Sequence, residues 1–487
     1  MRHWWGMKTT GWGTPRRACG SIGWMFACVV AGPWSGCILD GRPILAGDAP
    51  AFDTGADELP DAVADADADA DRSGDGDAAV DADAADDADA LEADGEIADE
   101  STDAVEAADE GGSACRLMPD PPTTLSAAVE LDRPQALAFA DPTSSTGPFG
   151  VLWRAPGPAM FDGLHFQRFD WEGHPERAPT FVLGGVELRE VHPILELPDG
   201  RLAIALSIPG GAGEGMWIKV AGSSGTGGAA PEQVPGTDAV SSAPSLAFDG
   251  SELVLAWLDG STGRDRIRVQ RFGAADGVAL GTDEVVASAS AVLAGPRLVW
   301  SGTGATLVYR DGGDDALHVL ALDESLAVAR EDVVTAPAGH VMVGSPALAF
   351  NGSELGLLWE TRDDVAGAIY LATFLPGEAP VLHEPLADLS LSIGETGELD
   401  LTAGGVTTWV LAWRHVRVGR AGVSLAFVDA SSLSRIGDPV DATPAATDVR
   451  NPGIAHSAGS TMVIWAEPNG TAFSIRETVY SCEPAGS

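Results

Sequence analysis

The stretch A-P-S-L-A-F-D-G-S-E-L-V-L-A-W, Ala243 to Trp257, contains two short apolar runs separated by a polar turn. It returns as S-P-A-L-A-F-N-G-S-E-L-G-L-L-W, Ser345 to Trp359. Both runs are too short for helices and are rich in residues that suit a pleated, buried surface. Each copy is therefore predicted to be a β-hairpin that ends on Trp.

Weaker copies of this hairpin recur along the chain at a nearly constant spacing. Successive end residues lie 52, 52, 52, 50, 54 and 52 positions apart; they are Trp153, Ala205, Trp257, Tyr309, Trp359, Trp413 and Trp465. A Pro precedes most copies, but Asp400 holds its place in the sixth. A period near fifty with several short strands is typical of a β-propeller blade.

The hairpin also predicts how a blade is built. Asp249-Gly250 and Asn351-Gly352 are preferred two-residue turns, in which both central residues have φ above zero. The second run, Leu253 to Trp257, is continuously apolar, which indicates that both faces of the blade are buried against neighbours. A β-sandwich is the alternative, but sandwiches do not usually repeat at a constant period.

The fold class is therefore all-β, a seven-bladed propeller of four-stranded antiparallel blades over residues 113–487. The last blade has three strands before the chain stops, near Gly453–Ser457, Thr461–Glu467 and Ala472–Tyr480. A spare strand lies at Thr123–Leu131. We expect this N-terminal strand to close the ring as the missing fourth strand.

Charge separates three regions of the 487 residues, whose net charge is −44. Residues 1–50 carry +3, residues 51–110 carry −23, and the remainder carries −24. This acidity argues against a nucleic-acid partner. Residues 37–112 form a linker rich in Asp and Ala, which is expected to be disordered and extended because it lacks large apolar side chains.

Residues 1–36 read as an export signal peptide, with Arg16-Arg17 ahead of an apolar stretch from Ala18 to Ala31. The segment ends W-S-G-C, which resembles a bacterial lipobox; Trp34 departs from the usual Leu. The resemblance implies lipidation of Cys37 and anchoring to the cell envelope through the lipid alone. Ordinary secretion is the alternative.

A weak calcium-loop pattern occurs in the linker. The run D-R-S-G-D-G-D from Asp71 has EF-hand-like offsets, but Ala82 stands where a bidentate acid belongs. Diffuse cation condensation is the expectation here. We expect no metal site and no cofactor in the protein, since the His residues show no ligand spacing.

Three of the five cysteines lie within residues 1–37, and the other two, Cys115 and Cys482, lie at the two ends of the repeat region. A pair of cysteines in an exported domain favours a disulfide, with two free thiols as the alternative. We expect this bond to stand where the missing turn of the last blade would run.

No catalytic motif occurs in the repeat region, so no catalytic residue is assigned. The residue after each Trp or Tyr is expected to start the loop between the second and third strands, on the face where propellers commonly bind ligands. Arg is unexpectedly frequent at these positions for so acidic a domain. The ligand-binding candidates are Arg154, Arg310, Glu360 and Arg414.

The phrase P-x-L-A-F-[DN]-G-S-E-L-x-L-x-W, behind an Asp/Ala spacer and a lipobox-like Cys, resembles secreted propeller lipoproteins of myxobacteria and their relatives. The resemblance implies an exported, envelope-anchored propeller but no particular function. The leading interpretation is a binding module for a glycan, a peptide or an envelope protein. The alternatives are a glycoside hydrolase or lyase, which needs convergent acid groups, and a structural surface protein.

Overall fold

The structure is a computed structural model that describes residues 114–483, apart from short gaps. The gaps are 118–122, 130–133, 139–147, 157–161, 185–189, 209–213, 261–264, 290, 387–397, 418–419, 444–448, 458 and 470–471. The predicted signal peptide, the linker, its calcium-like run and Cys37 lie outside the described residues. Among the described residues, no helix has the length and apolar character needed to cross a membrane.

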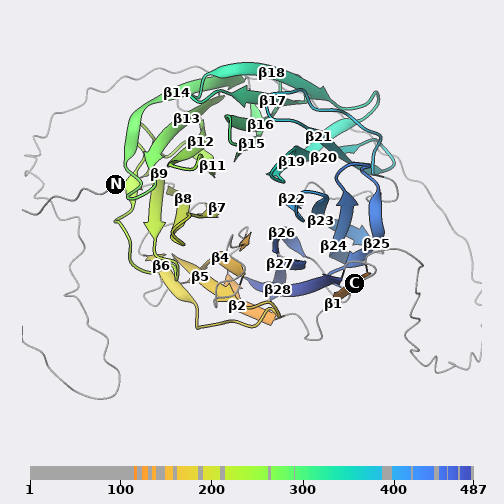
Figure 1. Cartoon of the computed structure of the whole chain (residues 1–487), viewed down its shortest axis with the longest axis horizontal. Helices are drawn as coiled ribbons and strands as arrows, with labels where there is room; N and C mark the ends of the chain where they lie inside the picture. Colours follow the sequence, from red (N-terminus) through yellow and green to blue (C-terminus); the bar gives the residue numbers. More distant parts are fainter. Residues whose placement is uncertain are drawn as a thin grey trace, which may run out of the picture. The chain divides into compact units, whose positions relative to one another are not determined.

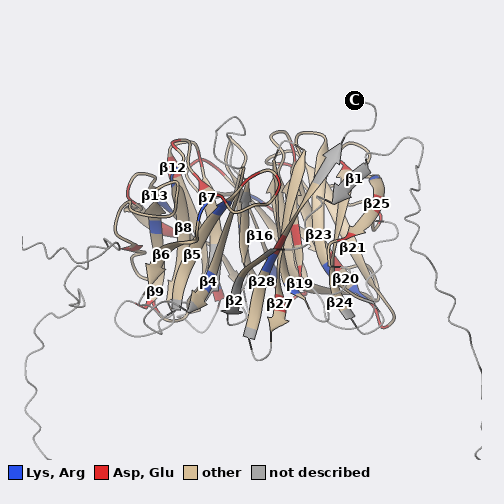
Figure 2. Cartoon of the chain, turned by 90° about the horizontal axis from the view of Figure 1, so that it is seen from below, with Lys and Arg blue, Asp and Glu red and all other residues tan. Residues whose placement is uncertain are grey.

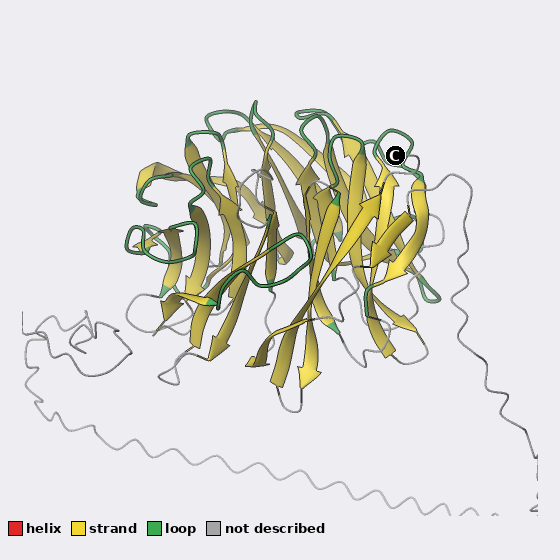
Figure 3. Cartoon of the chain, turned by 60° about the horizontal axis from the view of Figure 1, so that its bottom comes forward, coloured by secondary structure: helices red, strands yellow, loops and turns green. Residues whose placement is uncertain are grey.

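Seven antiparallel sheets stand around a common axis, and the chain completes them one after another (Figure 1). Within each sheet the first strand lies nearest the axis and later strands lie progressively outward. Loops join the strands at the two faces of the ring (Figure 3). The molecule is a seven-bladed β-propeller, which confirms the fold predicted from the repeat.

The first three blades are four-stranded. Their strands are β3 (Gln135–Ala138), β4 (Phe149–Pro156), β5 (Asp162–Phe169) and β6 (Thr180–Gly184); β7 (Glu190–Glu196), β8 (Leu202–Ile208), β9 (Gly215–Ala221) and β10 (Glu232–Gln233); and β11 (Ser241–Phe248), β12 (Glu252–Asp259), β13 (Asp265–Gly273) and β14 (Ala279–Ala289).

The remaining blades begin in the same way. Their strands are β15 (Val292–Trp300), β16 (Ala305–Asp311), β17 (Ala316–Leu322) and β18 (Val328–Thr335); β19 (Val341–Phe350), β20 (Leu355–Arg362) and β21 (Gly367–Phe374); β22 (Leu399–Ala403), β23 (Thr408–Arg417), β24 (Arg420–Asp429) and β25 (Arg435–Asp441); and β26 (Arg450–Ser457), β27 (Ser460–Asn469) and β28 (Ala472–Glu483).

Blade five has an irregular outer edge. Val381 forms an isolated bridge to Thr373, and the Leu386 amide donates to the Ile369 carbonyl, so residues 381–386 run beside β21 in place of a regular fourth strand. Val381 and Leu382 are exposed on this edge.

The turn in the defining hairpin differs from the prediction by one residue. Gly250 has φ of 102°, but Asp249 does not have a positive φ; the turn is centred on Gly250 and Ser251. The Asp249 carboxylate accepts hydrogen bonds from the Ser251 and Glu252 amides, at 2.8 and 2.7 Å. Asn351 caps the equivalent turn of blade five in the same way. These residues therefore act through their side chains rather than through left-handed backbone.

Seven apolar clusters form the core, and each one joins two neighbouring blades. Trp257 is buried between blades two and three, and Trp359 between blades four and five. Every residue of β8 is buried. Burial of both faces explains why the second strands are continuously apolar rather than alternating.

The last blade is completed by the N-terminal part of the described chain. β2 (Thr123–Val129) pairs antiparallel with the first half of β28, which confirms the prediction that an N-terminal strand completes the last blade. β1 (Ala114–Leu117) pairs with the end of the same strand, so the two short strands share the fourth place. Cys115 thus lies on a strand rather than in a turn, and its backbone register partner is Cys482. The disulfide stays a prediction.

Candidate functional site

The four residues proposed from the sequence lie in strands, not in loops. Backbone pairing continues past each Trp or Tyr, and the cross-strand partners are Arg154–Leu164, Arg310–Leu317, Glu360–Ile369 and Arg414–Val423. The expectation that these residues start loops is therefore wrong, because the second strands extend two or more residues beyond the aromatic residue. The four residues belong to blades one, four, five and six and are spread around the ring.

Three of these side chains have little exposure. Arg310 is 14% exposed, and its Nη2 donates to Asp315 at 2.6 Å. Arg414 is 7% exposed and donates from Nε to the Val449 carbonyl at 2.5 Å, while Glu360 is 1% exposed. These contacts join strands and neighbouring blades. Ligand binding by the four residues stays a prediction, and the contacts give Arg310 and Arg414 structural roles.

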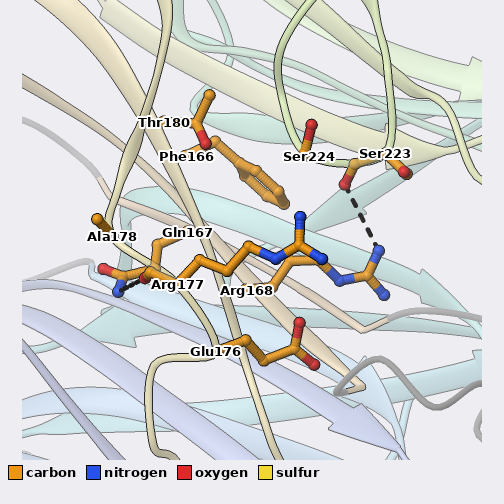
Figure 4. Close-up of a pocket in the computed structure, with 9 residues that line it drawn as sticks. All are labelled: Phe166, Gln167, Arg168, Glu176, Arg177, Ala178, Thr180, Ser223 and Ser224. Carbon is orange, nitrogen blue, oxygen red and sulfur yellow. Dashed lines mark hydrogen bonds between the residues drawn. The ribbon is translucent and has the colours of Figure 1, made fainter. Parts of the chain in front are cut away.

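A different cleft lies between blades one and two (Figure 4). Its volume is about 60 Å³. Residues of β5, of the segment before β6, of the start of β6 and of the turn after β9 line it; they are Phe166, Gln167, Arg168, Glu176, Arg177, Ala178, Thr180, Ser223 and Ser224. We call these residues the interblade cleft.

The loop after β5 folds back on that strand and brings the two cleft arginines together. The Glu176 amide donates to the Arg168 carbonyl at 3.0 Å. Gln167 Nε2 donates to the Arg177 carbonyl at 2.7 Å. As a result Arg177, nine residues further along the chain, lies beside Arg168, and both guanidinium groups reach into the cleft (Figure 4).

Arg168 experiences opposing electrostatic effects. Burial lowers its pKa, the carboxylates of Glu176 and Glu196 raise it, and the positive charge of Arg177 lowers it. Its Nη1 lies 3.5 Å from the Ser223 carbonyl, across the blade boundary. A guanidinium remains protonated in proteins despite such shifts, so the cleft holds two neighbouring positive charges.

Arg177 is the more accessible of the two. Its side chain is exposed and makes no hydrogen bond or ion pair with any residue that the structure describes. The hydroxyl groups of Thr180 and Ser224 lie in the same cleft, and Ser224 shares a hydrogen bond of 2.8 Å with Thr226. Acidic and basic residues are both spread over the side of the ring in Figure 2, and acids outnumber bases in the sequence after residue 110, whereas two arginines and one acid, Glu176, line the cleft.

Sequence inspection missed this site for a physical reason. Arg168 and Arg177 have no motif spacing, and their neighbours Ser223 and Ser224 come from the next blade. Only the folding back of the loop and the contact between blades bring these groups together.

The innermost strands are joined around the axis by hydrogen bonds from side chains to backbone. The hydroxyl of Ser245 accepts from the Leu298 amide at 2.8 Å, and Arg297 Nε donates to the Pro346 carbonyl at 3.3 Å. Asp400 accepts from the Ile454 amide at 2.8 Å and from the Leu401 amide at 2.9 Å. Asp400, which replaces the usual Pro, therefore connects blades six and seven.

Burial raises the pKa of Asp400 from its ordinary 3.8 to about 6, although two backbone amides and the charge of Arg297 oppose the shift. A carboxyl group that titrates near pH 6 is a property of many catalytic acids. Both of its oxygens are engaged by backbone amides, however, which is the arrangement of a structural bridge.

The three tyrosines of the chain have packing roles. Tyr309 stacks on His318 with ring centroids 4.9 Å apart, and Tyr370 stacks on Trp359 at 5.4 Å. Tyr480 is fully buried, and burial raises its pKa. These contacts account for the three rings through packing.

Comparison with known proteins finds no family model that matches the chain and no curated protein that matches it. Solved structures do match. One is a protein of unknown function from Dyadobacter fermentans, with 12% identity, a TM-score of 0.42, and coverage of 76% of this chain and 99% of that one. Another is an ulvan lyase of polysaccharide lyase family 25, with 10% identity, a TM-score of 0.45, and coverage of 74% and 96%.

A third match is the propeller domain of the Trilobed protease from Pyrococcus furiosus, which is described as having an open velcro topology. Identity is 9%, the TM-score is 0.32, and coverage is 60% of this chain and 94% of that one. These are likenesses of fold, and at such values they carry no argument about activity.

Proposed function

We propose that this protein is a carbohydrate-binding propeller whose interblade cleft holds the carboxylate or sulfate group of an acidic glycan. The proposal rests on one observation, the two neighbouring arginines Arg168 and Arg177 in an otherwise acidic ring. The comparisons supply the fold alone, and the ligand follows from the chemistry of the cleft.

Two adjacent guanidinium groups repel one another, and an anion placed between them turns this repulsion into attraction. The planar donor fork of Arg matches the geometry of carboxylate and sulfate oxygens, and a bond between charged partners is worth about 1.5–3 kcal/mol. The hydroxyls of Thr180 and Ser224 are suited to the neutral hydroxyls of a sugar. An acidic sugar supplies both kinds of group.

The overall negative charge of the ring does not prevent such binding. The residues after 110 carry −24, but charges more than about 8 Å away are largely screened at physiological salt. The lining of the cleft, with two arginines against the single carboxylate of Glu176, therefore determines the contact. The same overall charge is the reason that nucleic acid is not proposed as a partner.

The location belongs to the proposal as well. The signal peptide, the lipobox-like sequence at Cys37 and the acidic linker support an exported protein tethered to the envelope by a lipid. A tethered propeller on an extended linker is suited to bind polysaccharide at or beyond the cell surface.

Isothermal titration of the full-length chain tests the function. The ligands are polygalacturonate, a sulfated glucuronan and, as the neutral comparison, dextran. We expect binding of the acidic polymers only. Arg177→Ala is expected to weaken it about tenfold or more, since it removes a charge-assisted contact of at least about 1.4 kcal/mol.

Arg435→Ala is the matched control, because Arg435 lies on an outer strand and pairs with the exposed Asp438. We expect it to bind as the wild type does. Equal binding of dextran and the acidic polymers would contradict the proposal. Loss of binding in Arg310→Ala, with binding retained in Arg177→Ala, would instead assign the ligand to the positions chosen from the sequence.

A further inference from the structure

The turn that joins β16 to β17 in blade four brings together three side chains of metal-binding type. Asp311, Asp314 and His318 each offer one ligand atom, and these atoms lie within 4.8 Å of one another. We call these three residues, with Glu331 of the adjacent strand β18, the His318 cluster. It is separate from the interblade cleft, which lies between blades one and two.

Both ring nitrogens of His318 face carboxylates. Nδ1 lies 2.8 Å from Glu331 Oε1, and Nε2 lies 3.1 Å from Asp314 Oδ2. A neutral imidazole has a single N–H and can donate to only one of them. If Nδ1–H donates to Glu331, the lone pair of Nε2 lies on the side of Asp314, where a cation can bind both groups.

A carboxylate on the far nitrogen is the partner that orients metal-binding histidines and increases their basicity. The imidazole of His318 is also held by stacking on Tyr309, at 4.9 Å and 15°, and it is only 12% exposed. Its position is therefore fixed before any ion binds.

The two aspartates are oriented by the turn so that one oxygen of each stays available. Asp311 Oδ1 accepts from the Gly313 amide at 2.7 Å, and Asp314 Oδ1 accepts from the Ala316 amide at 3.2 Å. The next acid, Asp315, is already used by Arg310. This pairing compensates the positive charge of Arg310, which is the arginine nearest to the turn in sequence.

Other blades show that these carboxylates are not needed for packing. His165 occupies the same cross-strand position in blade one and stacks on Trp153 at 5.8 Å. It is covered by Phe181, and burial lowers its pKa. Tyr370 fills the position in blade five. Stacking is thus common to blades one, four and five, and the acids around His318 are additional to it.

From this geometry we propose that the His318 cluster binds a divalent ion of the zinc type. Its ligands are Nε2 of His318 and the free oxygens of Asp311 and Asp314, and Glu331 orients the imidazole. His nitrogen and carboxylate oxygen are both zinc ligands, whereas calcium prefers six to eight oxygens. Three protein ligands leave a coordination position for water or for a ligand group.

A second group with similar residues provides a control. Asp170, Glu172 and His174 also gather at one turn. His174 is 56% exposed, however, and its Nδ1 lies 3.4 Å from Asp170. The imidazole of His174 is thus far more exposed than that of His318, which is 12% exposed, so we assign no site to this group.

The test is isothermal titration of the full-length chain with Zn²⁺ after treatment with a chelator. We expect one specific equivalent in the wild type. His318→Tyr is expected to abolish it while the stacking seen at Tyr370 is retained, and Glu331→Gln is expected to weaken it about 10- to 100-fold. His174→Ala is expected to bind as the wild type does. Thermal unfolding confirms that each variant is folded.

The acidic linker contributes the same weak background to every variant, so the difference between wild type and His318→Tyr isolates the site. The same zinc isotherm in both proteins would overturn the proposal and leave His318 with a packing role on Tyr309. Loss of the site in His174→Ala would assign it to the other turn. Calcium binding as tight as zinc binding would overturn the assignment of the metal class.

Discussion

Stability above pH 5 is predicted to depend on Asp400, the residue that connects the inner strands of blades six and seven. Its carboxyl group has a pKa of about 6 in the folded protein, because burial disfavours its charged form, against an ordinary 3.8. The folded state therefore holds this proton more tightly than the unfolded state does. The resulting contribution to the free energy of unfolding is complete only below about pH 3.8 and is lost as the pH rises through about 6.

The size of the effect follows from the two pKa values. The full shift corresponds to about 3 kcal/mol, of which about 1.4 kcal/mol remains at pH 5 and almost none at pH 8. Asp400→Asn cannot titrate. It keeps one oxygen to accept from the Ile454 or Leu401 amide, and the loss of the other acceptor costs about 1 kcal/mol at every pH.

Urea unfolding followed by tryptophan fluorescence at pH 5, 6, 7 and 8 measures this difference. Relative to the wild type, Asp400→Asn is expected to become more stable by about 1.4 kcal/mol between pH 5 and pH 8. Ser245→Ala is the control, because Ser245 bridges blades three and four in the same way without titrating. It is expected to lose about 1 kcal/mol equally at all pH values. Parallel pH profiles for the wild type and Asp400→Asn would refute the reasoning.

Three further predictions concern the ring itself. Trp257→Ala is expected to cost about 3–5 kcal/mol in urea unfolding, since it empties the core between blades two and three; a cost below 1 kcal/mol would contradict this. Deleting residues 1–131 removes β1 and β2 and is expected to lower the Tm well below that of a chain lacking only residues 1–112; equal Tm values would show that closure is dispensable. Peptide mapping without reductant is expected to find Cys115 linked to Cys482, a bond worth up to about 5 kcal/mol, whereas two free thiols would refute it.

The fold could be predicted because its signal is periodic. Each blade has the same internal core, so the apolar second strand and its final Trp recur at intervals that can be counted. The closing strand was predictable for a related reason, since three strands remained at one end of the repeat region and one at the other. The irregular edge of blade five was not, because outer strands are half exposed and carry little apolar pattern.

The sites could not be predicted in the same way. Each depends on a contact between segments that the repeat does not specify. The interblade cleft requires the loop after β5 to fold back beside a turn of the next blade. The orientation of His318 depends on Glu331, thirteen residues away on another strand. The arginines chosen from the sequence lie in strands and not in loops, because the repeat gives the position of the Trp but not the residue at which the strand ends.

Closure of the ring by β2 and β28 has a consequence for synthesis. About 340 residues separate the two strands, and at about 5–20 residues per second the partner of β2 leaves the ribosome roughly 20–70 s after it. Throughout that interval β2 has no native partner, and the first blade exposes an apolar face that the last blade later covers. An unpaired strand is a template for pairing with other chains. Until β28 has been synthesised, β2 is therefore exposed to pairing with other chains.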